Sequence, residues 1–415
     1  MKKTFLLSCL MLAAMPVMAA YTGHVYVDKN KNGVFDQSEK PLAGIKVSDG
    51  LNVVETAADG SFTLPGHERE RFIFITTPSG YKTFNRHYHK IEKKQSGYDF
   101  GLIPYSGRIR KDGSHRYIHI TDTEIFNTEN HADWVNNVHD YARNEQAAFI
   151  IHTGDICYEK GLKAHIKLMN TENMDCPVFY CIGNHDLVKG KYGEELFESI
   201  YGPVYYSFDA GNVHYVVTPM SGGDHAPGYT SDDVCRWLKN DLAHIRPGTP
   251  VVVFNHDLLT YEDTFIFKSK NAGSINLNEY NLKAWVYGHW HINYMKKQGD
   301  VYSVCTSSLD KGGIDHSTTA FRVMHVDSKG DFTSELRYTY LDKNICIASP
   351  AGVMASGVLP VAVNVYSSVS PVREVLYTCL ADGKPVLKNK RLLQSTDWSW
   401  NGELPLSHKY VGKEL

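Results

Sequence analysis

Five short hydrophobic runs in the middle of the chain are each followed at once by polar residues. They are rich in β-branched and aromatic side chains and cover residues 117–120, 149–151, 178–182, 251–254 and 284–287. Continuous apolar runs of this length, bounded by Gly, Asn or Asp, predict buried strands. The run that ends in Gly154-Asp155 would deliver a carboxylate to the carboxyl edge of a sheet, where open α/β folds keep their sites.

Amphipathic segments separate these runs. Residues 131–145 predict a helix with Trp134, Val138 and Tyr141 on one face. Further helices are expected at residues 161–169, 193–200 and 232–245, and residues 205–217 predict a β-hairpin. Alternating strands and helices predict an α/β domain over residues 112–328.

Both flanks of this region have β character. Residues 21–105 contain short strand-like runs separated by turns such as Asp49-Gly50 and Asp59-Gly60, which predict a β-sandwich. The polar residues 105–113 predict a linker. Residues 330–415 predict a second β-domain, with strands at 361–366 and 375–378 and no ligand cluster. Its abrupt end at Leu415 leaves open a truncation within this domain.

The first residues have the layout of an export signal. Lys2 and Lys3 precede an apolar run over residues 5–17 and small residues at 19–20. This pattern predicts a signal peptide over residues 1–20 and an exported protein, periplasmic or extracellular. The apolar run is too short to span a membrane, and no other long apolar run predicts a transmembrane segment.

Composition narrows the classes of partner. The chain of 415 residues has a formal net charge of −3, which offers no basic excess for holding a nucleic-acid backbone. Of the 8 cysteines, Cys9 lies in the signal peptide. The others are scattered and predict mostly buried thiols, with a pairing of Cys176 and Cys181 left open. Nothing in the sequence indicates an oligomeric state.

The residues that follow the five runs are of metal-ligand type. Carboxylate, amide and imidazole donors in this mixture suit Zn, Mn or Fe. The chain has 20 His, so a single one means little, and His119, His152, His165 and His214 are expected to be structural. The candidate ligands are Asp122, Glu124, Asp155, Asn184, His256, His289 and His291.

The order of these motifs resembles the calcineurin-like metallophosphoesterase superfamily. Four of its five blocks stand intact across residues 115–325: Gly154-Asp155, Gly183-Asn184-His185-Asp186, His256 and Gly288-His289-Trp290-His291. The first block departs from the family, because Asp122-Thr123-Glu124 has Glu where the family has His. Extended backbone would point Asp122 and Glu124 in the same direction. The resemblance implies a four-layer α/β/β/α sandwich between the two β-domains, the first similar to prealbumin-like repeats.

The resemblance also implies roles for the residues. Asp155 would bridge two divalent metal ions (Mn, Zn or Fe). Asp122 and His291, with Glu124 or Tyr158, would complete the first, and Asn184, His256 and His289 the second. A hydroxide between the ions would attack a phosphomonoester or phosphodiester substrate. His185, held by Asp186, would act as general acid or orient the phosphate.

Two alternatives remain open at this point. Purple acid phosphatases also lack the first-block His and use a Tyr as an iron ligand at the spacing of Tyr158 from Asp155. Tyr158 would then serve an iron-containing centre, whereas otherwise it is a core or pocket-wall residue. The second alternative is a binding or surface protein with an inactive phosphoesterase fold, caused by the change at Glu124.

A separate pattern lies in the N-terminal β-domain. The segment from residue 28 to 39 follows the spacing of a calcium-binding loop, with Gly33 at the sharp turn. Plain turns share this composition, so a solvated Asn/Asp turn is the alternative. The predicted calcium ligands are Asp28, Asn30, Asn32, Asp36 and Glu39.

Overall fold

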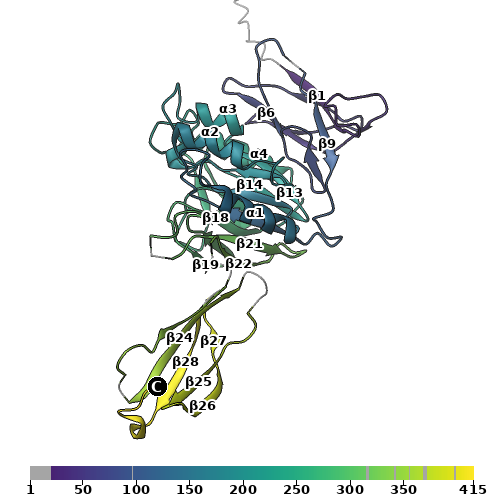
Figure 1. The fold of residues 1–415 in the computed structure, drawn as a ribbon. Helices are drawn as coiled ribbons and strands as arrows, with labels where there is room; N and C mark the ends of the chain where they lie inside the picture. The colour runs from purple at the N-terminus through teal and green to yellow at the C-terminus, as the bar shows by residue number, and fades with distance from the viewer. Residues whose placement is uncertain are drawn as a thin grey trace, which may run out of the picture.

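The computed structural model describes residues 20–95, 97–314, 317–340, 343–354, 356–367, 372–396 and 399–415. Nearly all of the predicted signal peptide therefore lies outside the described residues. No helix among the described residues is long and apolar enough to cross a membrane. In Figure 1 a β-rich N-terminal part lies above a central α/β part, and a slender β-rich part follows at the C-terminus.

The N-terminal part consists of two small sheets. One contains β1 (Tyr21–Val27), β2 (Lys40–Pro41), β5 (Ser61–Leu64), β7 (Tyr81–Thr83) and β9 (Phe100–Pro104). The other contains β3 (Lys46–Ser48), β4 (Val53–Glu55), β6 (Phe72–Ile75) and β8 (Tyr88–Lys90). Alternate residues of both sheets, including Val25, Leu64, Ile73 and Leu102, form a shared core. The strand-rich N-terminal region predicted from the sequence is confirmed.

Two mixed sheets form the central part. The first has the order β12-β11-β10-β21-β22, with β10 (His115–Ile120), β11 (Phe149–His152), β12 (Val178–Tyr180), β21 (Ala320–Val326) and β22 (Phe332–Tyr338). The second has the order β13-β14-β15-β18-β20-β19, with β13 (Tyr206–Ala210), β14 (Val213–Val217), β15 (Val251–Phe254), β18 (Leu282–Tyr287), β19 (Tyr294–Gln298) and β20 (Val301–Cys305). A hairpin of β16 (Ile266–Lys268) and β17 (Ser274–Asn276) lies outside them.

Aromatic rings hold the two central sheets together. Phe149 of β11 packs against Phe208 of β13 at 4.9 Å and against Tyr215 of β14 at 4.9 Å between ring centroids. Such edge-to-face pairs add to the stabilisation that comes from burying large rings. These contacts fix the relative position of the two sheets, and hence of the loops that leave them.

Four helices accompany the sheets: α1 (Ala132–Asn144), α2 (Tyr158–Leu168), α3 (Glu195–Tyr201) and α4 (Ser231–Ala243). They confirm the four predicted helices, with boundaries that differ by a few residues. In α1, Trp134 and Val138 pack on Ile118 and Ile150 of the first sheet. Thr230 caps the N-terminus of α4: its hydroxyl accepts a hydrogen bond from the Asp233 amide, which would otherwise be unpaired in the first turn of the helix.

The N-terminal part packs closely on the central part. Phe74 and Trp237 belong to one hydrophobic cluster. Arg71 forms 2.8 Å ion pairs with both Glu194 and Glu198. Apolar packing and buried ion pairs thus both connect the N-terminal part to the central part, so the two parts stabilise each other.

The C-terminal part contains β23 (Lys343–Ser349), β24 (Gly357–Ser367), β25 (Leu376–Ala381), β26 (Lys384–Arg391), β27 (Leu393–Gln394) and β28 (Ser399–Leu406). Val361, Val363 and Trp400 lie in its own small core. The Tyr338 amide donates a hydrogen bond to the Tyr366 hydroxyl at the junction with the central part. Cys176 and Cys181 are both buried free thiols, so the pairing left open by the sequence is not formed.

Candidate metal centre

The predicted ligands lie on loops that leave the carboxyl ends of parallel strands. β10, β11 and β12 run parallel in the first sheet, and β15 and β18 run parallel in the second. Because the sheets pack together, these loops converge at one end of the central part. They carry Asp122 and Glu124 after β10, Asp155 after β11, Asn184, His185 and Asp186 after β12, His256 after β15, and His289 and His291 after β18.

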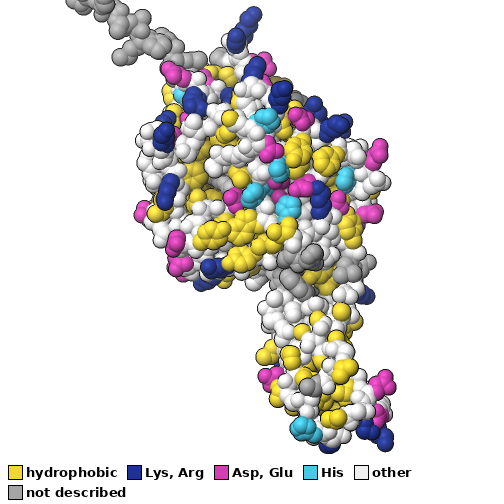
Figure 2. All heavy atoms as spheres, turned by 90° about the vertical axis from the view of Figure 1, so that its left-hand side faces the viewer, with side chains coloured by type: hydrophobic (Ala, Val, Ile, Leu, Met, Phe, Trp, Pro, Cys, Tyr) yellow, Lys and Arg dark blue, Asp and Glu magenta, His cyan; other side chains and the backbone are white. Residues whose placement is uncertain are grey.

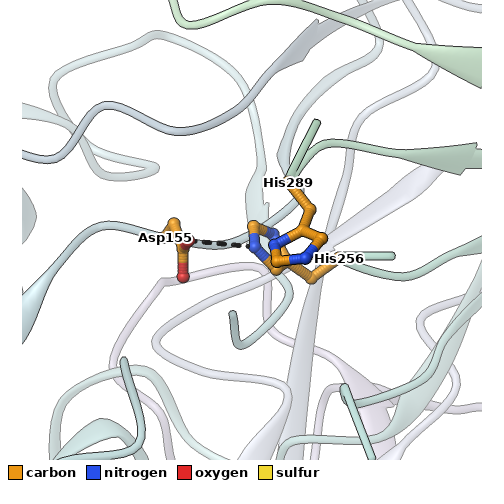
Figure 3. A group of neighbouring side chains, drawn as sticks. All are labelled: Asp155, His256 and His289. Atoms are coloured by element: carbon orange, nitrogen blue, oxygen red, sulfur yellow. Dashed lines mark ion pairs between the residues drawn. The ribbon is translucent and has the colours of Figure 1, made fainter. Parts of the chain in front are cut away.

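Three of these side chains form a compact cluster. Ligand atoms of Asp155, His256 and His289 all lie within 4.8 Å of one another (Figure 3). Asp155 Oδ2 lies 3.1 Å from His256 Nε2. One carboxylate and two imidazoles so close together are a donor set for a transition metal.

The orientation of His256 leaves one ring nitrogen available to a metal. Its Nδ1 lies 2.7 Å from the Thr153 carbonyl oxygen, which can only accept a hydrogen bond, so Nδ1 carries a proton. Burial alone would lower the pKa of His256, but the carboxylates of Asp155 and Asp122 raise it to about 10. The negative charge that attracts this proton would equally attract a cation.

Asp122 lies beside this cluster and is fully buried. Its Oδ1 lies 3.3 Å from His291 Nε2 and 3.9 Å from His256 Nε2. The His289 amide donates to Asp122 Oδ2 at 3.0 Å, and this bond fixes the carboxylate. A hydrogen bond to Asp122 raises the pKa of His291. Asp122 and His291 therefore form a second group of donors next to the first.

Glu124 lies at the edge of this second group. Its Oε1 is 3.4 Å from His291 Nε2, and its Oε2 pairs with the ammonium of Lys311. The carboxylate thus faces the candidate ligands with one oxygen and a lysine with the other. Lys311 offsets the negative charge that Glu124 adds where the family has a neutral histidine.

His185 has a different partner from the one expected. Its Nδ1 lies 2.9 Å from Asp224 Oδ2, whereas Asp186 accepts hydrogen bonds from the backbone amides of Gly183 and Cys157, each at 2.9 Å. The prediction that Asp186 holds His185 is therefore wrong. A fully buried carboxylate needs such donors, and Asp186 uses its own to brace the loop. Burial, together with the Asp155 charge, raises the pKa of Asp186 to about 7.

Asp224 changes the protonation of His185. Partial burial opposes the charged imidazole, but the hydrogen bond to Asp224 and the charge of Asp155 outweigh it and raise the pKa of His185. The side chain is about a third exposed at 34%. It is therefore a proton-bearing group that solvent and a bound molecule can reach.

Two motif glycines allow the loops to meet. A Cβ on Gly183 would lie 2.2 Å from Asp155 Oδ1, and a Cβ on Gly288 would lie 1.9 Å from Thr121 Oγ1 and 2.5 Å from Asp122 Oδ2. No side chain fits at such distances. Glycine is therefore required at both positions because the backbones approach the two central carboxylates directly.

The loops hold an unusual backbone conformation. Positive φ angles occur at 14 non-glycine residues of the described chain, and half of them lie in these loops: Asp122, Glu124, Asp155, Cys157, Tyr158, His289 and His291. Each such residue costs of order 1 kcal/mol or more, and such strain gathers at functional sites. The extended backbone expected at Asp122 and Glu124 is wrong, since φ is 50° and 44° there.

Tyr158 begins α2 with its ring beside His185, at 5.4 Å between centroids, and nearly parallel to Phe126 at 6.3 Å. Among the described contacts, none joins its hydroxyl to Asp122, Asp155 or His291. Whether Tyr158 is a metal ligand or a core or pocket-wall residue therefore stays a prediction.

Sequence reasoning missed two residues of this site, Asp224 and Lys311. Asp224 lies in the loop between β14 and α4, where the only signal in the sequence was the pair Gly222-Gly223. The structure shows that Gly223 approaches the Asn184 backbone closely, since a Cβ on Gly223 would lie 2.3 Å from the Asn184 carbonyl oxygen. Lys311 follows β20 in a loop with no ligand pattern. Both reach the site through long-range folding, which spacing along the chain does not encode.

The donor set fits metal ions. Asn184 Oδ1 is buried and has no hydrogen-bond partner in the described structure, and His256 Nε2 faces the carboxylates of Asp155 and Asp122. A buried polar atom without a partner costs about 1–3 kcal/mol, which coordination of a cation by Asn184 would recover. Both atoms have a lone pair to offer when His256 is neutral. The residues present therefore suit the divalent ions expected from the sequence.

The predicted calcium loop is a closed hydrogen-bonded turn. Asp28 accepts from the Gly33 amide at 2.9 Å, and the side-chain amides of Asn30 and Asn32 donate to Asp36 at 2.7 and 2.9 Å. Glu39 accepts from the Lys29 amide at 2.8 Å. The oxygens gather in one loop but already have partners, so calcium binding there stays a prediction.

Family models recognise both the N-terminal and the central part. Residues 29–104 match the N-terminal domain of calcineurin-like phosphoesterases, and residues 115–293 match the calcineurin-like phosphoesterase domain itself. Together the two models cover more than half of the chain. The fold and the donor cluster described above agree with these models, and the chain belongs to the calcineurin-like metallophosphoesterase superfamily.

A curated relative and several solved structures are similar to parts of the chain. Purple acid phosphatase 13 of Arabidopsis thaliana is 26% identical over 215 residues, which are 48% of this chain and 36% of that protein. The chain thus spans about a third of this relative. GAP50, the anchor in the inner membrane complex of Plasmodium, matches with a TM-score of 0.35 and 14% identity, covering 55% of this chain and 85% of the other. A putative 5'-nucleotidase from Staphylococcus aureus matches with a TM-score of 0.33 and 12% identity, covering 55% and 54%.

Proposed function

We propose that the protein is an exported phosphoesterase that hydrolyses a phosphomonoester or phosphodiester at a binuclear metal centre. The observation that carries the proposal is the meeting of two donor groups at one sheet edge. Asp155, His256 and His289 form one, and Asp122 and His291 lie directly beside it. The implied four-layer α/β/β/α order of the central part belongs to this proposal.

Each donor group would hold one ion. Asp122 and His291 would hold the first, Asn184, His256 and His289 the second, and Asp155 would serve both. Metal ions bound there would neutralise phosphoryl oxygens and lower the pKa of a water molecule, as hydrolysis of an anionic ester at neutral pH requires. Mn, Zn and Fe all suit this mixture of oxygen and nitrogen donors.

The chain's own residues supply proton transfer and orientation. His185 Nδ1 is held by Asp224, which leaves Nε2 free to donate a hydrogen bond to a phosphoryl or leaving-group oxygen. The hydrogen bond to Asp224 and the charge of Asp155 raise the pKa of His185, which favours its protonated form. Asp186 keeps the loop rigid through the backbone bonds it accepts. His185 is therefore the proposed general acid, and Asp224 its positioning residue.

Metal-dependent turnover tests the proposal. Purified protein should hydrolyse an aryl phosphate or phosphodiester, lose this activity with a chelator, and regain it with Mn or Zn. Folded protein that shows no turnover with any common divalent metal would instead favour the inactive binding protein.

An iron-containing centre is the second candidate, because the curated relative is a purple acid phosphatase. Tyrosinate bound to ferric iron absorbs visible light, so iron-loaded protein should be coloured and Tyr158→Phe should lose the colour. The contact of the Tyr158 ring with His185 and Phe126 favours the divalent centre over this candidate.

A further inference from the structure

The candidate metal centre forms the floor of an open pocket of about 510 Å³. Its polar lining comes from the centre itself, including Glu124, Asp155 and His289. The remaining lining residues are apolar: Trp290, Ile292 and Ile314. Figure 2 shows hydrophobic side chains gathered beside the exposed histidines on this face. A phosphate at the floor would therefore place its ester substituent against an apolar wall.

Trp290 is a rigid part of this wall. Its Nε1 donates to Asp257 Oδ1 at 3.1 Å, and Tyr287 packs edge-on against it at 5.2 Å between centroids. Tyr261 lies nearly parallel to Trp290 at 5.8 Å and is 74% exposed. A ring held in this way loses little conformational freedom when a ligand packs on it.

Ile314 is held over the pocket by a loop that is tied to the centre. The Ile314 amide donates to the His291 carbonyl at 2.9 Å, and the Ser308 hydroxyl donates to the Asp122 carbonyl at 2.7 Å. Between them, Lys311 pairs with Glu124. The side chain of Ile314 is nevertheless 76% exposed. The loop thus fixes an uncovered apolar side chain at the pocket, where a bound substituent would cover it.

We propose that Trp290 and Ile314 form a subsite for the alcohol portion of the substrate, and that this portion carries a flat apolar ring. The inference rests on the proposed function, since it assigns the floor of the pocket to phosphate. A flat ring gains dispersion and stacking contact on Trp290, whereas a small hydrophilic alcohol leaves the wall uncovered. Trp290 and Ile314 then determine specificity and take no part in metal binding.

Binding of two non-hydrolysable phosphonates to the metal-loaded protein tests this subsite. Phenylphosphonate and methylphosphonate share the anionic group and differ in the ring. Isothermal titration calorimetry should show phenylphosphonate binding about five- to tenfold tighter to the unaltered protein, the usual value of an aromatic contact. Ile314→Ser should reduce this ratio about threefold or more, and Trp290→Leu should bring it close to one.

Ile345→Ser is the matched control, because Ile345 is similarly exposed at 73% but lies in the C-terminal part. It should leave the ratio unchanged, and no variant should weaken methylphosphonate binding. Equal binding of the two phosphonates, or a ratio unaffected by Ile314→Ser, would overturn the subsite while leaving the metal centre intact. If neither phosphonate bound to the metal-loaded protein, and inorganic phosphate did not bind either, the proposed function would be overturned instead. Ile314→Ser changes only a surface side chain, so the test stands even if Trp290→Leu does not fold.

Discussion

The two halves of the candidate centre are built differently. On one side, Asp155, His256 and His289 bring ligand atoms within 4.8 Å, and a backbone carbonyl orients His256. On the other, Asp122 and His291 are joined by Glu124, whose carboxylate is shared between His291 and Lys311. In the first half, Asp155, His256 and His289 are the residue types that the resemblance implies. The second has exchanged a neutral imidazole for an ion pair.

If the centre holds two ions as proposed, this difference confines the departure from the family pattern to one of the two metal positions. The carboxylate of Asp155 lies 3.1 Å from His256 Nε2 in one half, and it also lies within 4.8 Å of the Glu124 carboxylate in the other. Glu124 lies at the rim, where a lysine can offset an added charge. The Asp122 side is therefore the half where metal preference can change without loss of the centre.

The largest expected effect comes from the residue shared by both halves. Asp155→Ala should remove both metal ions and lower kcat/KM by about a thousandfold or more, since metal catalysis contributes several kcal/mol. Elemental analysis with kinetics measures this. Asp140→Ala, at a side chain that is 68% exposed, should change neither quantity. Retention of one full ion by Asp155→Ala would separate the two halves and contradict the shared carboxylate.

Replacing His185 should slow the reaction without changing the metal content of either half of the centre. His185→Ala is expected to keep the metal content and lower kcat by roughly a hundredfold, the usual value of a positioned acid. Asp224→Asn should give a smaller loss and move the alkaline limb of the kcat–pH profile to lower pH, because Asp224 helps to raise the pKa of the general acid His185. If His185→Ala lost metal as Asp155→Ala does, His185 would be a ligand instead.

Metal binding on the Asp155 side should release a proton. The pKa of His256 is raised to about 10, so the metal-free ring is protonated at neutral pH and a cation must displace that proton. The apparent metal affinity should therefore rise about tenfold per pH unit between about pH 6 and pH 8. Calorimetry in two buffers of different ionisation heat measures the released protons directly. An affinity that does not vary with pH would show that His256 is not a ligand.

The Asp122 side can be returned to the family pattern. Glu124→His should raise zinc affinity on that side about threefold to tenfold, because the site gains a nitrogen donor. It should also increase activity on simple aryl phosphates, because the site becomes less repulsive to an anionic substrate. A second variant combines Glu124→His with Lys311→Met, because the Lys311 ammonium would otherwise lose its ion-pair partner. Glu159→His, on an exposed turn of α2, is the control. Unchanged zinc affinity in both Glu124 variants would mean that Glu124 points away from the metal.

How far the sequence predicts this site depends on where each residue lies. Asp155 and His256 follow β-branched runs, so the strands and the polar residues at their ends are visible in the pattern. Parallel strands of one sheet end at the same edge, which makes the gathering of ligands within each sheet predictable. The meeting of the two sheets, which brings Asp155 to His256, depends on their packing. Asp224 and Lys311 come from loops without periodicity, and they meet His185 and Glu124 only after the chain has folded.

Two other predictions, the Asp186–His185 pair and the extended backbone at Asp122, are wrong because contacts within the folded loops decide them. Asp186 looked like the natural partner of His185 because it is adjacent in sequence, but its carboxylate turns inward to the Gly183 and Cys157 amides. The positive φ of Asp122 was not visible either, since L residues rarely adopt it and only tertiary contacts such as the amide of His289 hold it there.

The central claim is that one carboxylate joins two metal ions at this sheet edge. Anomalous diffraction from crystals of the protein grown with Mn, measured near the Mn absorption edge, tests whether one carboxylate joins two ions. Two anomalous peaks about 3.5–4 Å apart are expected, with Asp155 between them, Asp122 and His291 at one, and His256 and His289 at the other. A single peak at this edge, or two peaks of which only one contacts Asp155, would contradict it.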